Sequence, residues 1–409
     1  YHHALATEQV AAHFTAGRAT WFDAEAPRVE LLNPSGDAPL DQATLIVSGR
    51  AGQDVGDLDS VEVELVAAAD SEGPPTVTAS VVPDSSGGWA VEIPKELAPG
   101  EYVARATQRD AAGNAGIAVS ERFAVADTAA LDTEAVLLAA GDIAGCGGSK
   151  HNATFALIEQ HPEATVAALG DLAYEDGSQE EFAECYAPSW GQALERTRPA
   201  LGNHEYGTED AVGYFDFFAD TLVELGPDAS DPGRGWYSYD LGSWHVVVLN
   251  SNCADVVGGC GSGSPQDEWL RADLADSEAR CTLAYWHHPR FSSSTVHPPG
   301  VEMSALWETL DQAGVELALT GHHHGYERFA PQGADGTLEP ETGVSQFIVG
   351  TGGRGSYQSS TVLSPNSAVR ASDTYGVLKL SLGEGSYHWE FLAAEGSTFT
   401  DSGSRRCHD

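Results

Sequence analysis

The chain has 409 residues, enough for two domains, and its hydrophobic content of 42% with nine tryptophans excludes a disordered protein. Acidic residues number 61 against 20 Lys and Arg, which gives a formal net charge of −41. A charge of this sign and size repels nucleic acid and anionic lipid, so we expect no nucleic-acid partner. The apolar runs are much shorter than the roughly 20 residues of a membrane helix, so we expect no membrane insertion.

Residues 28–126 contain short stretches in which polar and apolar residues alternate, separated by Gly, Pro and Asp. This period-two pattern, clear at 61–66, 76–82, 89–93 and 102–107, is typical of strands with one buried face. It predicts a β-sandwich of roughly 100 residues. The pattern resembles the immunoglobulin-like or fibronectin-III-like modules of secreted bacterial proteins. We interpret residues 1–27 as an N-terminal arm.

The pattern changes at residue 133, where continuous apolar runs replace the alternation. The run at 135–140 ends in Gly141-Asp142, residues 152–160 have a helical pattern, and the run at 165–169 ends in Gly170-Asp171. Strand, helix and strand in this order predict an α/β domain over residues 133–409. Further buried strands are expected at 244–249, 282–286, 315–319 and 346–349.

The cysteines include no Cys-x-x-Cys pair, which argues against a zinc ribbon or a thioredoxin-like site. Their even number suits three disulfides in an oxidising compartment, and the first residue, Tyr1, favours a secreted chain whose leader has been removed. Many connectivities are possible. We favour Cys253 with Cys260 across a Gly-rich turn, Cys146 with Cys185, and Cys281 with Cys407. A thiolate metal ligand at Cys146 is the alternative to its disulfide.

Side chains that bind metals follow five separate strand ends. These candidate ligands are Asp142, Asp171, Tyr174, Asn203, His287, His322 and His324. Because the carboxyl ends of the strands in an open α/β sheet converge on one crevice, we expect the donors to meet there. Oxygen and imidazole donors with one shared carboxylate suit two ions of the Fe, Mn or Zn type, about 3.5–4 Å apart.

Five short blocks stand in order between residues 141 and 324. They are Gly141-Asp142-Ile143-Ala144, Gly170-Asp171-Leu172-Ala173-Tyr174, Gly202-Asn203-His204-Glu205, Ala284-Tyr285-Trp286-His287 and Gly321-His322-His323-His324. They resemble the blocks GDxG, GDxxY, GNH[DE], VxxH and GHxH of the calcineurin-like metallophosphoesterases. Tyr174 and the continuation Gly325-Tyr326-Glu327-Arg328 resemble the purple acid phosphatase branch of that superfamily. Ala144 and Ala284 depart from the blocks, and neither change removes a ligand.

The resemblance implies a four-layer α/β/β/α catalytic domain that hydrolyses phosphomonoesters by attack of a metal-bound hydroxide. It implies Fe(III) held by Asp142, Tyr174, His324 and one oxygen of Asp171. It implies Zn, Mn or Fe(II) held by Asn203, His287, His322 and the other oxygen of Asp171. His204 and His297 are then candidates for the acid that protonates the leaving group. A β-module before the catalytic domain is also found in plant-type purple acid phosphatases.

The remaining candidates have less specific patterns. His287 and His288 adjoin, and alternation directs only one of them inward. The resemblance, through its His-x-Pro spacing, implies that this is His287, so we expect His288 to support the ligands or contact substrate. His204 is also expected to contact substrate. Arg354 is a candidate for binding the substrate phosphate or a solvated loop charge. Phosphodiester or nucleotide hydrolysis, a mononuclear zinc hydrolase and a non-catalytic surface-binding module are the alternatives. The expected partner is a small phosphate ester, and the sequence gives no oligomeric state.

Overall fold

The computed structural model divides the chain into two compact units, Tyr1–Thr128 and Ala129–Asp409. The residues that the structure describes are 26–33, 40–41, 46–70, 73–83, 87–93, 97–98, 100–120, 122–126, 133–297, 299–355 and 364–408. The expected N-terminal arm lies, up to residue 25, outside the described residues. Within the described residues, no helix combines the length and hydropathy needed to cross a membrane.

The N-terminal unit is built from strands, as the alternating pattern predicts. One sheet has the order β1 (Glu30–Asn33), β3 (Ile46–Arg50), β6 (Gly88–Glu92). The other has the order β2 (Leu40–Asp41), β9 (Phe123–Ala126), β7 (Gly100–Asp110), β4 (Asp57–Ala67), β5 (Val77–Val81), and β8 (Ala115–Val119) also pairs with β7. Alternate residues of β4, such as Val61, Val63 and Leu65, meet Val47 and Trp89 of the first sheet in one core.

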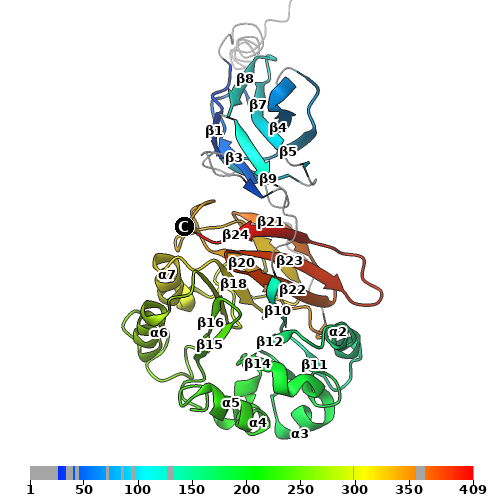
Figure 1. Ribbon diagram of the computed structural model, residues 1–409, viewed down its shortest axis with the longest axis vertical. Coiled ribbons are helices and arrows are strands. Elements are labelled where there is room, and N and C mark those ends of the chain that lie inside the picture. Colours follow the sequence, from blue (N-terminus) through cyan, green and yellow to red (C-terminus); the bar gives the residue numbers. More distant parts are fainter. Residues whose placement is uncertain are drawn as a thin grey trace, which may run out of the picture. The chain divides into compact units, whose positions relative to one another are not determined.

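The second unit has a mixed α/β fold around two large sheets (Figure 1). The six-stranded sheet has the order β14 (Thr197–Ala200), β12 (Thr165–Leu169), β10 (Thr133–Ala140), β22 (Gly376–Gly383), β23 (Ser386–Ala393), β24 (Ser402–Arg406). The seven-stranded sheet has the order β15 (Tyr237–Leu241), β16 (Trp244–Val248), β17 (Cys281–Tyr285), β18 (Leu317–Thr320), β20 (Ser345–Val349), β19 (Tyr326–Phe329), β21 (Ser367–Ala371). A short pair joins β11 (Ala144–Gly145) to β13 (Ala173–Tyr174).

Hydrophobic side chains place the helices on these sheets. Leu380 of one sheet and Val246 of the other belong to the core that both sheets share. Val247, which points the opposite way along β16, packs instead in a second cluster with Leu270 of α6 (Pro265–Asp276) and Trp307 of α7 (Ser304–Gln312). Helix α2 (Lys150–Glu159) lies against β22 of the six-stranded sheet. Figure 1 shows α6 and α7 on one side of this unit and α2 on the other.

Short helices complete the unit, and several of them lie within the connections between the strands. They are α3 (Gln179–Glu181), a π-helix (Phe182–Tyr186), α4 (Val212–Phe217), α5 (Ala219–Leu225) and the 3-10 turns Trp190–Arg196, Glu205–Gly207, Glu209–Ala211 and Val301–Met303. Ser178 starts α3 with a capping box formed with Glu181.

Backbone hydrogen bonds connect the loops at the strand ends, both between the two sheets and within the seven-stranded sheet. Gly141, which follows β10, donates its N–H to the carbonyl oxygen of Val349 at the end of β20, over 2.9 Å. Gly321, which follows β18, donates to the carbonyl oxygen of His287 after β17, over 3.0 Å. The loops that carry the candidate ligands therefore lie together at one end of both sheets, as the parallel strand order requires.

Candidate metal centre

Three candidate ligands have a left-handed backbone conformation directly after a glycine. The φ angles are 60° at Asp142, 52° at Asp171 and 67° at His322. Such conformations cost on the order of 1–3 kcal/mol each for residues other than glycine, and they cluster at functional sites. The glycines matter because the loops touch: a Cβ atom at Gly202 would lie 2.2 Å from the carboxylate of Asp171, and one at Gly321 would lie 2.8 Å from that of Asp142.

One group of donors surrounds the phenol oxygen of Tyr174. This oxygen lies 2.9 Å from Asp142 Oδ1, 3.1 Å from Asp171 Oδ2 and 3.3 Å from His324 Nε2. His324 Nε2 also lies 3.1 Å from Asp142 Oδ1. All four side chains are buried. The structure thus brings together four side chains that the sequence assigned to one ion.

A second group of donors shares the carboxylate of Asp171. His287 Nε2 lies 3.1 Å from Asp171 Oδ2, and the donor atoms of Asp171, His287 and His322 all lie within 4.8 Å of one another. The backbone N–H of His322 donates to Asp142 Oδ2 over 2.8 Å, which connects this group to the first. Asp171 Oδ2 is therefore close to both Tyr174 and His287.

The histidines are oriented as metal ligands usually are. His287 donates from Nδ1 to the carbonyl oxygen of Leu169 over 2.8 Å, and His324 donates from Nδ1 to the carbonyl oxygen of Gly355. Each ring thereby presents Nε2 to a carboxylate, the arrangement expected when a backbone acceptor fixes the tautomer of a ligating histidine. Nε2 of His287 is buried and faces Asp171 Oδ2 at 3.1 Å. These donors fit one or more cations of the type that binds oxygen and imidazole.

Burial and charge shift the pKa values in this cluster. Burial raises the pKa of Tyr174 well above its ordinary value, and the carboxylates of Asp142 and Asp171 raise it further. A phenolate here therefore requires a nearby cation. Burial alone would raise the pKa of Asp171, but the charges and hydrogen bonds of His287 and His204 lower it overall. Burial, with neighbouring histidines, lowers the pKa of His322, which favours the neutral ring that a metal ligand needs.

Asn203 and His204 lie beside this cluster, after β14. Asn203 is exposed, and no contact of its side chain with the donors is seen; the next residue, His204, donates its backbone N–H to Asp171 Oδ1 over 2.9 Å. The ring of His204 packs 4.4 Å, centroid to centroid, from the ring of Tyr174, and its Nδ1 contacts the carbonyl oxygen of Glu175. Because the side chain is 31% exposed, it is accessible to a molecule that enters from solvent.

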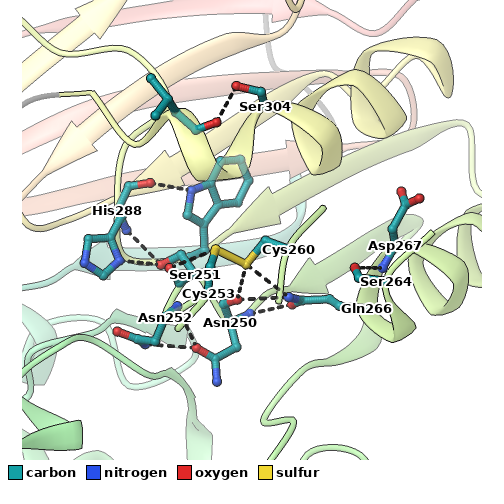
Figure 2. The surroundings of a disulfide bond; sticks show 12 residues. Asn250, Ser251, Asn252, Cys253, Cys260, Ser264, Gln266, Asp267, His288 and Ser304 are labelled. Atoms are coloured by element: carbon teal, nitrogen blue, oxygen red, sulfur yellow. Dashed lines mark hydrogen bonds between the residues drawn. A yellow bond between two sulfur atoms is a disulfide. The ribbon is translucent and has the colours of Figure 1, made fainter. Parts of the chain in front are cut away.

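His288 and His297 flank His322. Their rings lie 4.4 Å and 4.2 Å, respectively, from its ring. His288 is held by Ser251: its backbone N–H donates to Ser251 Oγ over 3.0 Å, and its Nδ1 lies 2.8 Å from the same oxygen. Figure 2 shows this contact next to the disulfide between Cys253 and Cys260, which closes the loop after Ser251. Burial lowers the pKa of His288 to about 3, so the ring is neutral.

Arg354 lies over the aromatic face of Tyr174. Its guanidinium carbon is 4.7 Å from the ring centroid, and it forms an ion pair with Glu175. The loop is fixed because the Arg354 N–H donates to the carbonyl oxygen of Asp142 over 2.8 Å. The side chain is 35% exposed. The structure thus places Arg354 beside the candidate ligand Tyr174.

Two buried glutamates received no role in the sequence analysis: Glu205 in the third block and Glu327 in the continuation of the fifth. Glu205 accepts hydrogen bonds from backbone amides in two ligand loops. Glu327 accepts from the N–H of Ser293 over 3.0 Å and contacts the hydroxyl groups of Ser293 and Ser367. The only hint of a role in the sequence was their place in or next to the blocks. Their hydrogen-bond partners could not be predicted, because most of them are more than 30 residues away in the sequence.

All six cysteines form disulfides, so Cys146 is not a thiolate ligand. The pairs are Cys146–Cys185, Cys253–Cys260 and Cys281–Cys407, which are the pairs favoured from the sequence. The first ties the loop after β11 to the π-helix, and the last ties β17 to the end of β24.

Comparison with known proteins identifies the class of this unit. Residues 132–326 match the family model described as calcineurin-like phosphoesterase, so the chain carries a domain of this family. Purple acid phosphatase 21 of Arabidopsis thaliana is 33% identical over 176 residues, which is 40% of this chain and 38% of that protein. Purple acid phosphatase 18 of the same plant is 29% identical over 232 residues, 52% of this chain and 48% of that protein. The chain is thus a relative of the purple acid phosphatases and spans less than half the length of these two.

Other matches bear on fold and on activity. A purple acid phosphatase from yellow lupin seeds has the same fold, with a TM-score of 0.55 and 18% identity, over 94% of this chain and 75% of that chain. A relative 28% identical over 254 residues, 53% of this chain and 39% of that protein, is named a probable inactive purple acid phosphatase of Arabidopsis thaliana. The relatives together support a metal-dependent phosphoesterase. Because one of them is named inactive, they do not show which reaction a member of the group catalyses.

Proposed function

We propose that this chain is a secreted phosphatase that hydrolyses phosphomonoesters with two metal ions. The observation that carries the proposal is the position of Asp171 Oδ2, which lies 3.1 Å from both the Tyr174 phenol oxygen and His287 Nε2. One carboxylate between two donor groups is what a two-ion centre requires. Secretion is supported by the three disulfides, which persist in oxidising compartments.

Asp142, Tyr174, His324 and Asp171 would hold one ion, and Asn203, His287, His322 and Asp171 would hold the other. The hard phenolate donor favours Fe(III) at the first position, and Zn, Mn or Fe(II) suits the second. When bound, such a pair neutralises charge on the phosphoryl group and lowers the pKa of a water molecule. For Asn203 to take part, its exposed side chain must turn toward Asp171.

The chain's own side chains would orient the ester and supply a proton. Arg354 would bind a non-bridging phosphate oxygen, because its guanidinium is fixed beside the donors by Glu175 and is partly exposed. His204 would protonate the leaving oxygen, and His297 is the second candidate for that step. His288, neutral and held by Ser251, would support His322 or contact substrate.

Metal analysis combined with a visible spectrum tests the centre. Two ions per chain, one of them iron, with a charge-transfer band from Tyr174 are expected. One zinc ion per chain would favour a mononuclear hydrolase, and an iron-free active protein would favour a zinc or manganese phosphoesterase.

Substrate comparison tests the reaction. Faster hydrolysis of p-nitrophenyl phosphate than of bis(p-nitrophenyl) phosphate is expected, whereas the reverse would identify a phosphodiesterase. Nucleotides as the best substrates would identify a nucleotidase. A metal-loaded chain that turns over none of these would favour a surface-binding module.

The N-terminal unit is proposed to be an immunoglobulin-like or fibronectin-III-like domain at 28–126, preceding the four-layer catalytic domain at 133–409.

A further inference from the structure

Glu205 is a fully buried carboxylate whose hydrogen-bond partners are backbone amides of two different loops. Its Oε2 accepts from the N–H groups of Asp171, over 2.9 Å, and Gly202, over 2.8 Å. Its Oε1 accepts from the N–H of Leu172 over 2.7 Å. The N–H of Ala173 also donates to Oε1, over 3.4 Å. A single carboxylate thus binds the segment after β12 at three positions and the loop after β14 at one.

These two loops carry the shared carboxylate and the neighbouring candidate ligand Asn203. They are in direct contact, because a Cβ atom on Gly202 would meet Asp171 N and Asp171 Oδ1 at 2.2 Å each. Asp171 is also one of the residues with a left-handed backbone. Since that conformation is unfavourable for aspartate, contacts around it must maintain it. Two of the Glu205 bonds go to Asp171 and to the residue directly after it.

We propose that Glu205 is a positioning residue that holds Asp171 and Asn203 in register and thereby sets the affinity of the centre for its two ions. The inference rests on the proposed function, because it assumes that these residues are ligands. Charged carboxylates make strong hydrogen bonds to backbone amides, and neighbours that orient ligands typically change metal affinity about 10–100-fold when they are replaced.

Replacement by glutamine separates the hydrogen bonds from the shape of the side chain. In Glu205→Gln one oxygen becomes an NH2 group, which cannot accept from the amides that face it. Glu205→Asp keeps the carboxylate but shortens the side chain, so part of the bridging should remain. Glu316→Gln is the matched control: Glu316 is also buried and accepts the N–H of His408, and it contacts neither loop.

Zinc titration of the metal-free full chain, in competition with a coloured chelator, measures the effect. The wild type and Glu316→Gln should bind two equivalents with the same affinity. Glu205→Gln should bind about 10–100-fold more weakly, and Glu205→Asp should fall between them. Wild-type affinity in Glu205→Gln would overturn the inference. A wild type that binds no metal would instead contradict the proposed function.

Hydrogen exchange of the metal-free chain tests the anchoring without any ion. In Glu205→Gln, amides at 171–172 and 202 should exchange at least about tenfold faster, while the remaining strands keep their protection. Unchanged exchange at these amides would overturn the inference even if metal affinity fell. If Glu205→Gln does not fold, the same two measurements on Glu205→Asp decide, and wild-type values in both would overturn it.

Discussion

His204 occupies the position at which a proton donor would be useful without being a ligand itself. Its Nε2 is 3.8 Å from Asp171 Oδ2, and its ring packs against Tyr174. We expect His204→Ala to keep both ions and to lose about 10²–10⁴-fold in kcat, the usual contribution of a general acid. The loss should be larger for an alkyl phosphate than for p-nitrophenyl phosphate, because an alkoxide leaves poorly without a proton.

Metal content and kcat with both esters check this prediction. Equal losses for the two esters would assign His204 to substrate binding and not to proton transfer. Full activity of His204→Ala would leave His297 as the remaining candidate for the acid.

At the residue level, the sequence predicted those donors that follow a local pattern. A buried apolar run that ends in Gly-Asp is visible within a few residues, so Asp142 and Asp171 could be found from it. The anchoring by Glu205 could not, since Asp171 and Leu172 lie 34 and 33 residues away in the sequence. The left-handed backbone of His322 was equally hidden, because the surrounding loops impose it and no local preference does.

Strand β18 is preceded by a buried carboxylate that should make stability depend on pH. Burial raises the pKa of Glu316 from 4.5 to about 8, and the side chain is 1% exposed. The folded chain therefore keeps a proton that the unfolded chain releases. The resulting stabilisation is complete below pH 4.5 and is lost as the pH rises through about 8. Its slope is at most about 1.4 kcal/mol per pH unit.

Glu316→Gln removes this proton exchange. Denaturant unfolding of both proteins across that pH range should show a smaller decrease in unfolding free energy for the variant. Parallel curves for the two proteins would contradict the pKa shift.

The disulfides should differ in their contribution to stability because they close loops of different length. Cys281 and Cys407 are 126 residues apart, whereas Cys253 and Cys260 are 7 apart. The loop-entropy relation gives about 4–5 kcal/mol for the first and about 2–3 kcal/mol for the second. Replacing each pair by alanines should therefore lower the unfolding free energy more for Cys281 and Cys407. A larger loss from the Cys253 and Cys260 pair would show that holding the loop next to Ser251 matters more than loop length.

At the level of elements, buried strands were easier to predict than their partners. The runs at 165–169 and 244–249 contain β12 and β16, whereas the run at 315–319 begins two residues before β18. The C-terminal strands β22 and β23 were not predicted, although burial alternates along most of β23 and in the middle of β22. The pairing of β22 with β10 joins residues more than 200 positions apart, which no local pattern encodes.

The net negative charge of the whole molecule should slow the association of its proposed anionic substrates. The net charge is −41, and phosphate esters are anions, so approach to the centre works against long-range repulsion. Salt shortens the range of this repulsion from about 30 Å at 0.01 M to about 8 Å at 0.15 M. We therefore expect kcat/KM to rise with ionic strength over this range.

The size of this effect should follow the charge of the substrate. A phosphomonoester dianion should gain more from added salt than a phosphodiester monoanion, because repulsion scales with the product of the charges. Measuring kcat/KM for both esters in NaCl and in KCl separates screening from effects of a particular ion. A decrease of kcat/KM with salt would mean that the local positive charge of the ions and Arg354 outweighs the field of the rest of the molecule. Equal responses of the two esters would mean that salt acts on the protein and not on the encounter.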